Sequence, residues 1–190
     1  MGEILEHPQA PTRHRLDVDA YTKMAEAGIL AHPHRVELID GEIFDMAAIG
    51  SPHAAITSRL VRSFALAAAD ARALLRVQDP LRLDGYNEPQ PDIVLLRPRA
   101  DDCRGGHPNA ADVLLLVEVS ESSLAHDRGT KLALYARFGV SEVWIVDLSG
   151  SAVEVYRDPT EDRCASSSRM TQGALTPARI PTIDLATFLA

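Results

Sequence analysis

The sequence predicts an α/β fold in which a mixed β-sheet is flanked by helices. Segments with apolar residues at helical spacing alternate with shorter runs typical of strands, in the order hairpin, helix, three strands, helix and two strands. The run 113–117 (Val-Leu-Leu-Leu-Val) is apolar at every position, which is typical of a central strand covered on both sides. Aromatic residues make up only 5% of the chain, so we expect a core built mainly from Leu, Val, Ile and Ala.

The 190 residues suggest a single domain, residues 17–190, preceded by a flexible arm. The arm, residues 1–16, is rich in proline, histidine and charge and lacks the basic start and apolar run of a signal peptide. No stretch of the sequence reaches the apolar length that spans a membrane. The two cysteines, Cys103 and Cys164, lie far apart and have no metal-ligand spacing. We therefore expect a cytoplasmic protein with no membrane partner.

Two short signals organise the N-terminal part of the domain. Asp17 is suited to cap a short helix that ends before Gly28. The Asp40-Gly41 pair is flanked by strand-like residues and predicts a β-hairpin over residues 36–44.

The next helix is expected to begin at Ser51-Pro52, with Ser51 as the N-cap and Pro52 in the first helical position. The elements expected after it are strands over 74–83, 92–97 and 113–119, a helix over 123–138, strands over 142–147 and 152–157, and a small helix with Leu185 and Phe188. We expect residues 152–157 to form an edge strand, and the polar residues 158–174 to form an exposed loop.

Two acidic residues stand at the facing ends of two predicted strands. Strands 92–97 and 113–119 are joined without a crossover helix, so we expect them to be antiparallel, with Asp92 close to Glu118. If the two residues face each other, their Cβ atoms lie within roughly 4.5–5.5 Å, and the carboxylates can ligate one Mg²⁺ or Mn²⁺ ion. Lys131, on the helix that follows Glu118, can then orient the attacking water and stabilise charge on a phosphate.

A set of motifs occurs in one order between residues 17 and 157: Glu37-Leu-Ile-Asp-Gly-Glu42, Gln90-Pro-Asp92, Val117-Glu-Val-Ser120, Asp127-Arg-Gly-Thr-Lys131-Leu-Ala-Leu-Tyr135-Ala-Arg and Val143-Trp-Ile-Val-Asp147. As a set they resemble the Uma family of putative restriction endonucleases, within the PD-(D/E)XK nuclease superfamily. The resemblance implies a bacterial protein with a restriction endonuclease-like αβββαβ core plus an N-terminal helix and β-hairpin. It also implies a metal at Asp92 and Glu118, catalysis by these residues with Lys131, and Glu37 as a further catalytic candidate. Ser120 departs from the superfamily pattern, which has lysine there, so the resemblance implies a lysine moved to the next helix.

Each candidate also has a structural interpretation. Asp92 can be an exposed acid at a strand entry, and Glu118 can form a structural ion pair with a lysine or arginine of a helix. Lys131 can pair with Asp127 on the helix surface at i,i+4 spacing, which contributes about 0.2–0.5 kcal/mol.

Other polar residues near these motifs are weaker candidates. Glu37 is predicted on a solvent-facing side of the hairpin, and Glu42, at the turn, is the alternative acid. His53 can line a site, although a capping or surface role is the simpler interpretation. Zinc binding by His32 and His34 is disfavoured, because Pro33 lies between them in a loop.

These residues and the resemblance together predict a divalent-metal-dependent endonuclease that hydrolyses phosphodiester bonds of nucleic acid, DNA in particular. The net charge of −8 counts against a strong non-specific DNA binder, because phosphate neutralisation requires clustered Lys or Arg. Two alternatives therefore stay open: a nuclease-like binding or regulatory protein with weak or no catalysis, and a hydrolase of small phosphodiesters. A homodimer is expected of an enzyme that cuts both strands of a duplex.

Overall fold

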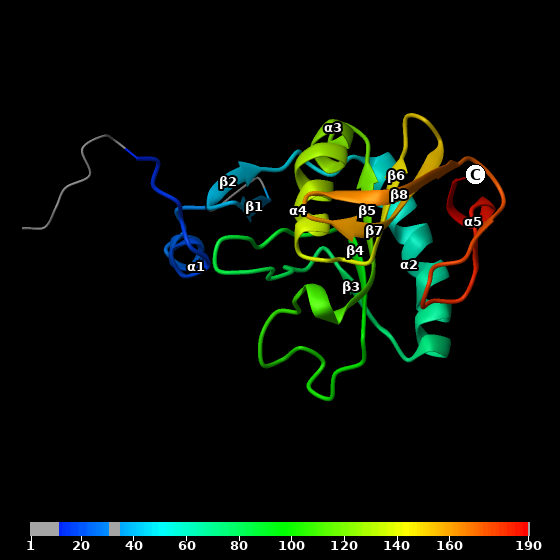
Figure 1. Ribbon diagram of the computed structural model, residues 1–190, viewed down its shortest axis with the longest axis horizontal. Helices are drawn as coiled ribbons and strands as arrows, with labels where there is room; N and C mark the ends of the chain where they lie inside the picture. The colour runs from blue at the N-terminus through cyan, green and yellow to red at the C-terminus, as the bar shows by residue number, and fades with distance from the viewer. Residues whose placement is uncertain (1–11, 31–34, 190) are drawn as a thin grey trace, which may run out of the picture.

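A six-stranded mixed sheet forms the centre of the computed structural model, which describes residues 12–30 and 35–189 (Figure 1). In spatial order its strands are β3 (Leu74–Val77), β4 (Ile93–Leu96), β5 (Val113–Ser120), β6 (Glu142–Asp147), β7 (Ala152–Thr160) and β8 (Arg163–Met170). β5 and β6 are parallel, and the other neighbouring pairs are antiparallel. The predicted mixed sheet and the predicted antiparallel pairing of β4 with β5 are therefore confirmed.

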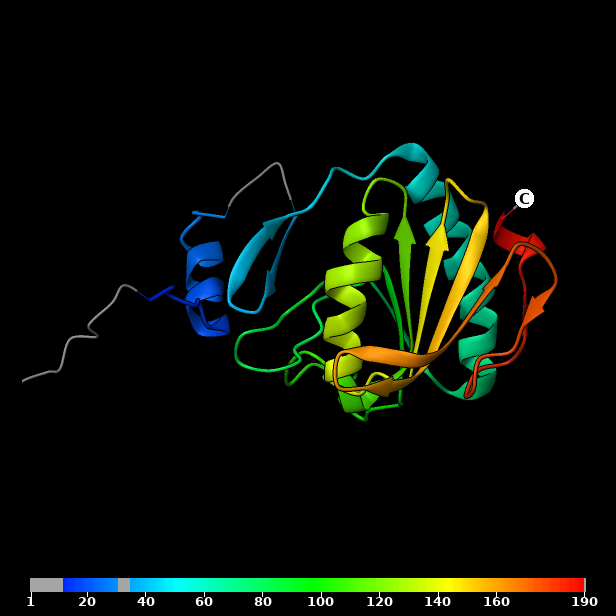
Figure 2. The same cartoon turned by 45° about the horizontal axis from the view of Figure 1, so that its top comes forward.

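Helices cover both faces of this sheet (Figure 2). α2 (Ser51–Ala71) and the short α5 (Ala186–Leu189) pack on one face, while α4 (Leu132–Arg137) packs on the other. Successive residues of a strand point to opposite faces, so each strand between two helical layers must be apolar on both sides. β4 divides its residues in this way, with Ile93 and Leu95 in the core beneath α2 and Val94 and Leu96 in the core beneath α4.

A helical crossover joins the parallel strands β5 and β6, as parallel pairing requires. The helix predicted over 123–138 is present but irregular, because α3 (Leu124–His126) leads through a π-helical turn, Asp127–Lys131, into α4. Five residues carry too little periodicity to distinguish a π turn from an α-helix in the sequence. Since the crossover starts where β5 ends, the π turn lies at the same end of the sheet as Glu118.

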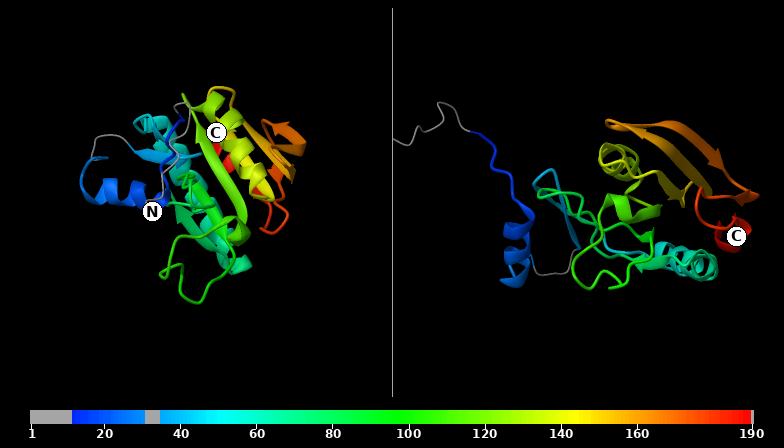
Figure 3. Two further views of the ribbon diagram at one scale, coloured as in Figure 1. Left: turned by 60° about the vertical axis from the view of Figure 1, so that its left-hand side comes forward. Right: turned by 60° about the horizontal axis from the view of Figure 1, so that its bottom comes forward.

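α1 (Val18–Glu26) and the hairpin of β1 (Val36–Ile39) and β2 (Glu42–Asp45) lie beside the main sheet, at the end of the molecule opposite α5 (Figure 3). Both predicted elements are confirmed. Asp17 caps α1 by accepting a hydrogen bond from Ala20 N at 2.7 Å. The turn residues Asp40 and Gly41 both have positive φ, as a two-residue type I′ hairpin turn requires.

The hairpin is anchored to the main body through β1. Glu88 N donates to Leu38 O at 2.8 Å, and the Leu38 side chain is fully buried against Val18 and Tyr21 of α1. Because side chains alternate along a strand, the neighbouring Glu37 points to the other side, into the main body.

Residues 13–16 run along the hairpin before α1. Leu16 N donates to Gly41 O at 3.0 Å, and Arg13 forms an ion pair with Glu42. The division into an arm of residues 1–16 and a domain of residues 17–190 stays a prediction, since residues 1–11 lie outside the described part of the chain.

Two predicted element boundaries are wrong: the end of β3 and the start of α2. β3 stops at Val77 instead of 83, because Gln78 has a positive φ of 53° and Pro80 has no amide hydrogen to continue a ladder. α2 already includes Ser51, so Gly50 takes the N-cap position that was predicted for Ser51.

The predicted edge of the sheet is also wrong. Much of the expected loop 158–174 is strand: β7 continues to Thr160 and pairs along its length with β8, which is the true edge. β8 is serine-rich and mostly exposed, so it lacks the apolar alternation by which strands are recognised. Its backbone pairing with β7 holds it in place instead.

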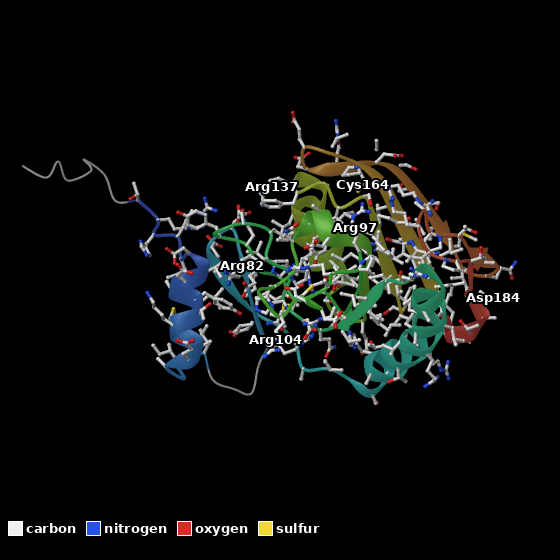
Figure 4. All side chains as sticks on the ribbon, turned by 90° about the horizontal axis from the view of Figure 1, so that it is seen from below. Arg82, Arg97, Arg104, Arg137, Cys164 and Asp184 are labelled. Carbon is white, nitrogen blue, oxygen red and sulfur yellow. The ribbon has the colours of Figure 1, made fainter. Side chains whose placement is uncertain are left out.

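The remaining elements are small: η1 (Ala110–Asp112), β9 (Ala174–Leu175) and β10 (Ile183–Asp184). β9 pairs with β10, which leads into the predicted C-terminal helix, and the Phe188 side chain of that helix is fully buried. Figure 4 shows Asp184 at this end of the molecule, away from α1. None of the helices in residues 12–30 and 35–189 is long and apolar enough to cross a membrane.

The stability of the fold is expected to depend on the buried face of α2. Leu60→Ala removes a side chain with no exposed surface, so we expect it to lower the free energy of unfolding by about 2–5 kcal/mol. Leu66→Ala, the same change on the same helix at a side chain that is 76% exposed, is expected to stay within about 0.5 kcal/mol. Urea denaturation measures both, and equal losses would contradict the packing of α2 on the sheet.

Candidate active site

A cavity of about 50 Å³ lies where the hairpin, the start of α2 and the ends of β4 and β5 meet. Its lining includes four acidic side chains that are almost fully buried: Glu37, Asp92, Glu118 and Asp127. Lys131 lines the same cavity. The fold thus brings together all four residues that the sequence singles out as catalytic candidates, although they come from β1, the residue before β4, β5 and the π turn.

Lys131 forms a buried ion-pair cluster with two of these acids. Its ammonium lies 2.8 Å from Glu118 Oε1 and 3.1 Å from Glu37 Oε1, and its side chain is 1% exposed. Tyr135, one helical turn beyond Lys131, donates its hydroxyl to the same Glu118 oxygen at 2.5 Å. The ion pair considered as the structural alternative for Glu118 is therefore present, and Lys131 itself forms it.

Burial and charge act in opposite directions on this cluster. Burial raises the pKa of Glu118 to about 8, while the Lys131 ammonium favours the ionised carboxylate. Burial by itself lowers the pKa of Lys131, but the carboxylates of Glu118 and Glu37 outweigh it and hold the pKa above its ordinary value. Burial and the neighbouring carboxylate of Glu118 also raise the pKa of the Tyr135 hydroxyl. These shifts favour the charged form of Lys131 and the protonated, hydrogen-bond-donating form of Tyr135.

Asp92 occupies the opposite wall of the site and is held by three donors. Its Oδ2 accepts from Val119 N at 2.9 Å and lies 3.1 Å from His53 Nε2, while its Oδ1 accepts from Gln78 Nε2 at 3.1 Å. Burial would raise the pKa of Asp92, but the hydrogen bond and charge of His53, with the Val119 amide, hold it below its ordinary value. The side chain is only 7% exposed, so the interpretation of Asp92 as an exposed strand-entry acid is wrong.

His53 belongs to the site, where the sequence favoured a capping or surface role. It lies in the first turn of α2, is 8% exposed, and its Nδ1 is 3.4 Å from Thr57 Oγ1. No local signal distinguishes it, because its partner Asp92 is 39 positions away in the sequence.

The π turn arranges the residues at the end of β5. Asp127 does not pair with Lys131 on a helix surface; its Oδ2 accepts from Ser120 Oγ at 2.7 Å and from Ser123 Oγ at 2.6 Å. Ser120, at the position where the wider superfamily has lysine, is buried and donates its hydroxyl to the first residue of the turn. π turns are rare and frequently occur at functional sites, and here both ends of the turn, Asp127 and Lys131, face the cavity.

The prediction that Glu37 faces solvent is wrong. Its side chain is 1% exposed, and its Oε1 accepts from Gln90 N and from Lys131, both at 3.1 Å. Its Oε2 is buried without a hydrogen-bond partner. The alternative acid, Glu42, forms its ion pair with Arg13 and does not line the cavity. His32 and His34 lie outside the described residues.

The donor set fits a hard divalent cation that keeps part of its hydration shell. Within residues 12–30 and 35–189, no three His, Cys, Asp or Glu side chains converge closely enough to form a complete metal cage. Mg²⁺ does not require one, because it is typically bound through one or two carboxylates, several waters and substrate phosphates. Asp92 and Glu118 supply carboxylate oxygens, and the unpartnered Oε2 of Glu37 is a further acceptor facing this site.

Comparison with known proteins agrees with the fold. The Uma2 family model, described as a putative restriction endonuclease, matches residues 18–185. The chain is similar to a crystal structure of a putative nuclease belonging to DUF820 from Anabaena variabilis ATCC 29413. The TM-score is 0.66 at 16% sequence identity, over 92% of this chain and 97% of that one, so the likeness concerns the fold. No curated protein matches the chain.

Removing the buried cation tests the charge balance of the cluster. Lys131→Met leaves Glu37 and Glu118 without their ion-pair partner, and we expect the free energy of unfolding at neutral pH to fall by about 3–5 kcal/mol. Lys23→Met, the matched change at an exposed lysine of α1, is expected to cost less than about 1 kcal/mol. A similarly small loss for Lys131→Met would mean that a proton on Glu118, and not Lys131, neutralises the cluster.

Proposed function

The chain belongs to the Uma2 family of putative restriction endonucleases, and from this premise we propose that it is a divalent-metal-dependent endonuclease that hydrolyses phosphodiester bonds of DNA. One observation carries the proposal: acidic side chains from separate elements and a single lysine converge on one small cavity at the end of the central strands. Oxygen donors of this kind select hard cations. Such a cation can polarise a phosphoryl oxygen, and a lysine beside it can stabilise charge that develops on a phosphate.

In the proposed mechanism Asp92 and Glu118 would hold Mg²⁺ or Mn²⁺. When bound, the cation supplies Lewis-acid polarisation of a phosphoryl oxygen and lowers the pKa of a bound water. Lys131 donates from Nζ to the attacking water or to a phosphoryl oxygen, which stabilises charge as it develops. Glu37 positions the ammonium through its 3.1 Å contact, and Tyr135 holds Glu118 through its hydroxyl.

The charge of the cavity supports metal dependence. Its lining holds five carboxyl side chains, Glu37, Asp92, Glu118, Glu121 and Asp127, against two permanent cations, Arg35 and Lys131. A phosphodiester carries negative charge and is repelled by an acidic surface. A bound divalent cation offsets this repulsion, so substrate and metal are expected to bind in a mutually dependent way.

A second candidate function is a nuclease-like protein that binds nucleic acid without cutting it. The observation that favours it is that Lys131 forms ion pairs with two carboxylates, so its ammonium is less available to contact a substrate. This candidate predicts no specific Mg²⁺ or Mn²⁺ site, whereas the nuclease requires one. Metal binding measured by calorimetry therefore distinguishes the two.

Cleavage assays test the nuclease directly. Wild-type protein with Mg²⁺ or Mn²⁺ is expected to cut nucleic acid in a panel of duplex and single-stranded DNA, supercoiled plasmid, RNA and a small model diester. EDTA is expected to abolish the activity. Asp92→Asn removes a proposed metal ligand and is expected to lower the rate by at least about 100-fold and to weaken Mn²⁺ binding, since even outer partners of metal ligands contribute 10–100-fold.

Asp162→Asn is the matched control, because Asp162 is exposed and lies outside this cavity. It is expected to retain wild-type cleavage and Mn²⁺ binding. Cleavage that Asp92→Asn retains in full would exclude the proposed site, and turnover of the model diester alone would favour a small-phosphodiester hydrolase. Well-folded wild-type protein that binds no divalent metal would favour the non-catalytic candidate.

A further inference from the structure

Arg35, the residue immediately before β1, places its guanidinium in the wall of the acidic cavity. Two of its nitrogens, Nε and Nη1, are buried and have no hydrogen-bond partner, although the side chain as a whole is 29% exposed. Its carboxylate neighbour is Asp92, and the distance from Nη1 to Asp92 Oδ1 is 4.0 Å. That separation is too long for a hydrogen bond.

Asp92 makes hydrogen bonds to other donors and none to Arg35. Its Oδ2 is used by Val119 N and His53, and its Oδ1 accepts from Gln78. The second cation of the cavity, Lys131, is already paired with two carboxylates. Among the described residues that line the cavity, Arg35 is thus the permanent cation with unused buried donors.

Some arginines elsewhere in the structure show a contrast, although Arg76 Nε, which forms an ion pair with Asp79, is also buried without a hydrogen bond. Several of them donate to a carboxylate at ordinary hydrogen-bond length: Arg82 to Glu88 at 2.8 Å, Arg137 to Asp40 at 2.7 Å and Arg157 to Glu142 at 2.7 Å. Buried donors left unpaired are costly, and unsatisfied polar groups in a native structure call for an explanation such as a catalytic role or an absent ligand.

We propose that Arg35 binds the phosphodiester group that is cleaved, by donating its free guanidinium N–H groups to phosphate oxygens. This inference rests on the proposed function and assigns the substrate contact within it. A planar guanidinium matches phosphate geometry and can donate two parallel hydrogen bonds. The surrounding carboxylates disfavour a free anion, so a cation held by Asp92 and Glu118 would be needed to offset their charge when the phosphate binds Arg35.

This role requires a group that is held in place but not satisfied before substrate arrives. The weak pairing with Asp92 keeps the guanidinium in the cavity without using its donors. A structural arginine would instead contribute stability through complete hydrogen bonding, as Arg157 does with Glu142 and Thr176 O. The two roles therefore predict opposite effects of removing the side chain on stability.

The test compares Arg35→Met with Arg104→Met, which removes the same charge from an exposed loop residue outside the cavity (Figure 4). Binding of a labelled DNA duplex is measured by fluorescence anisotropy over a salt series, with Ca²⁺ in place of Mg²⁺. For Arg35→Met we expect the dissociation constant to rise about 10- to 100-fold and the log–log salt slope to become shallower by about one. Arg35→Lys keeps the charge but not the fork geometry of the guanidinium. Its dissociation constant for DNA is therefore expected to lie between those of wild type and Arg35→Met.

Two further measurements separate substrate binding from a structural role. The melting temperature of Arg35→Met is expected to stay unchanged or to rise, because the substitution removes unpaired buried donors. Its Mn²⁺ affinity by calorimetry is expected to be retained, because Arg35 is not a metal ligand. Arg104→Met is expected to match wild type in all three measurements.

A melting temperature lowered by several degrees together with unchanged DNA affinity would overturn the proposal and make Arg35 structural. If wild type binds DNA and Mn²⁺ and Arg35→Met binds both equally well, the Arg35 assignment fails while the proposed function survives. If wild type binds DNA through Arg35 but binds no Mn²⁺, the metal-dependent nuclease fails while the phosphate contact is supported. Wild type that binds no DNA in any condition would overturn the Arg35 assignment as well.

Discussion

The buried contact of Lys131 with Glu37 and Glu118 is the interaction on which the rest of the structure depends. It joins the N-terminal hairpin, the central strand β5 and the crossover helix. Burying charges costs several kcal/mol per ion unless partners and additional hydrogen bonds compensate. The three elements must therefore meet in one geometry, which the Tyr135 hydroxyl and the Gln90 amide complete. A small displacement of the hairpin would remove Glu37 and leave the ammonium partly unpaired.

The sheet topology places the other half of the site at the same end of the molecule. Antiparallel pairing of β4 with β5 brings the start of one strand to the end of the other, so Asp92 lies beside the segment that contains Glu118. Parallel pairing of β5 with β6 requires a crossover that begins at that end. The acids and the lysine are therefore neighbours in space because of the directions in which β4, β5 and β6 run. They are far apart in the sequence because loops and a helix connect these strands.

Among the described residues, two buried side chains in the cavity have polar atoms without hydrogen-bond partners, and they differ in character. Glu37 Oε2 is an unused acceptor, whereas the Arg35 Nε and Nη1 groups are unused donors of a cation. The acceptor suits a water or a hydrated cation, and the donors suit an anion. Unsatisfied buried groups reduce stability, and each calls for an explanation such as a bound ligand. Both groups line the cavity that we propose to bind a metal ion and a phosphate.

The sequence by itself determined the layered α/β class, the hairpin at Asp40-Gly41, the central apolar strand and the ordered motifs that contain Asp92, Glu118 and Lys131. Each of these features follows from the periodicity, turn residues or spacing within a single short segment of the chain. Only the tertiary structure decided that Glu37 is buried, that His53 and Arg35 enter the site, and that β8 forms the sheet edge. The burial of Glu37 and the entry of His53 and Arg35 depend on partners far away in the chain, as His53 and Asp92 are 39 positions apart. β8 pairs with the adjacent β7, but its exposed polar residues lack the apolar alternation by which a strand is recognised. Burial and pairing between distant segments leave no periodic pattern, so they become visible only when the chain is folded.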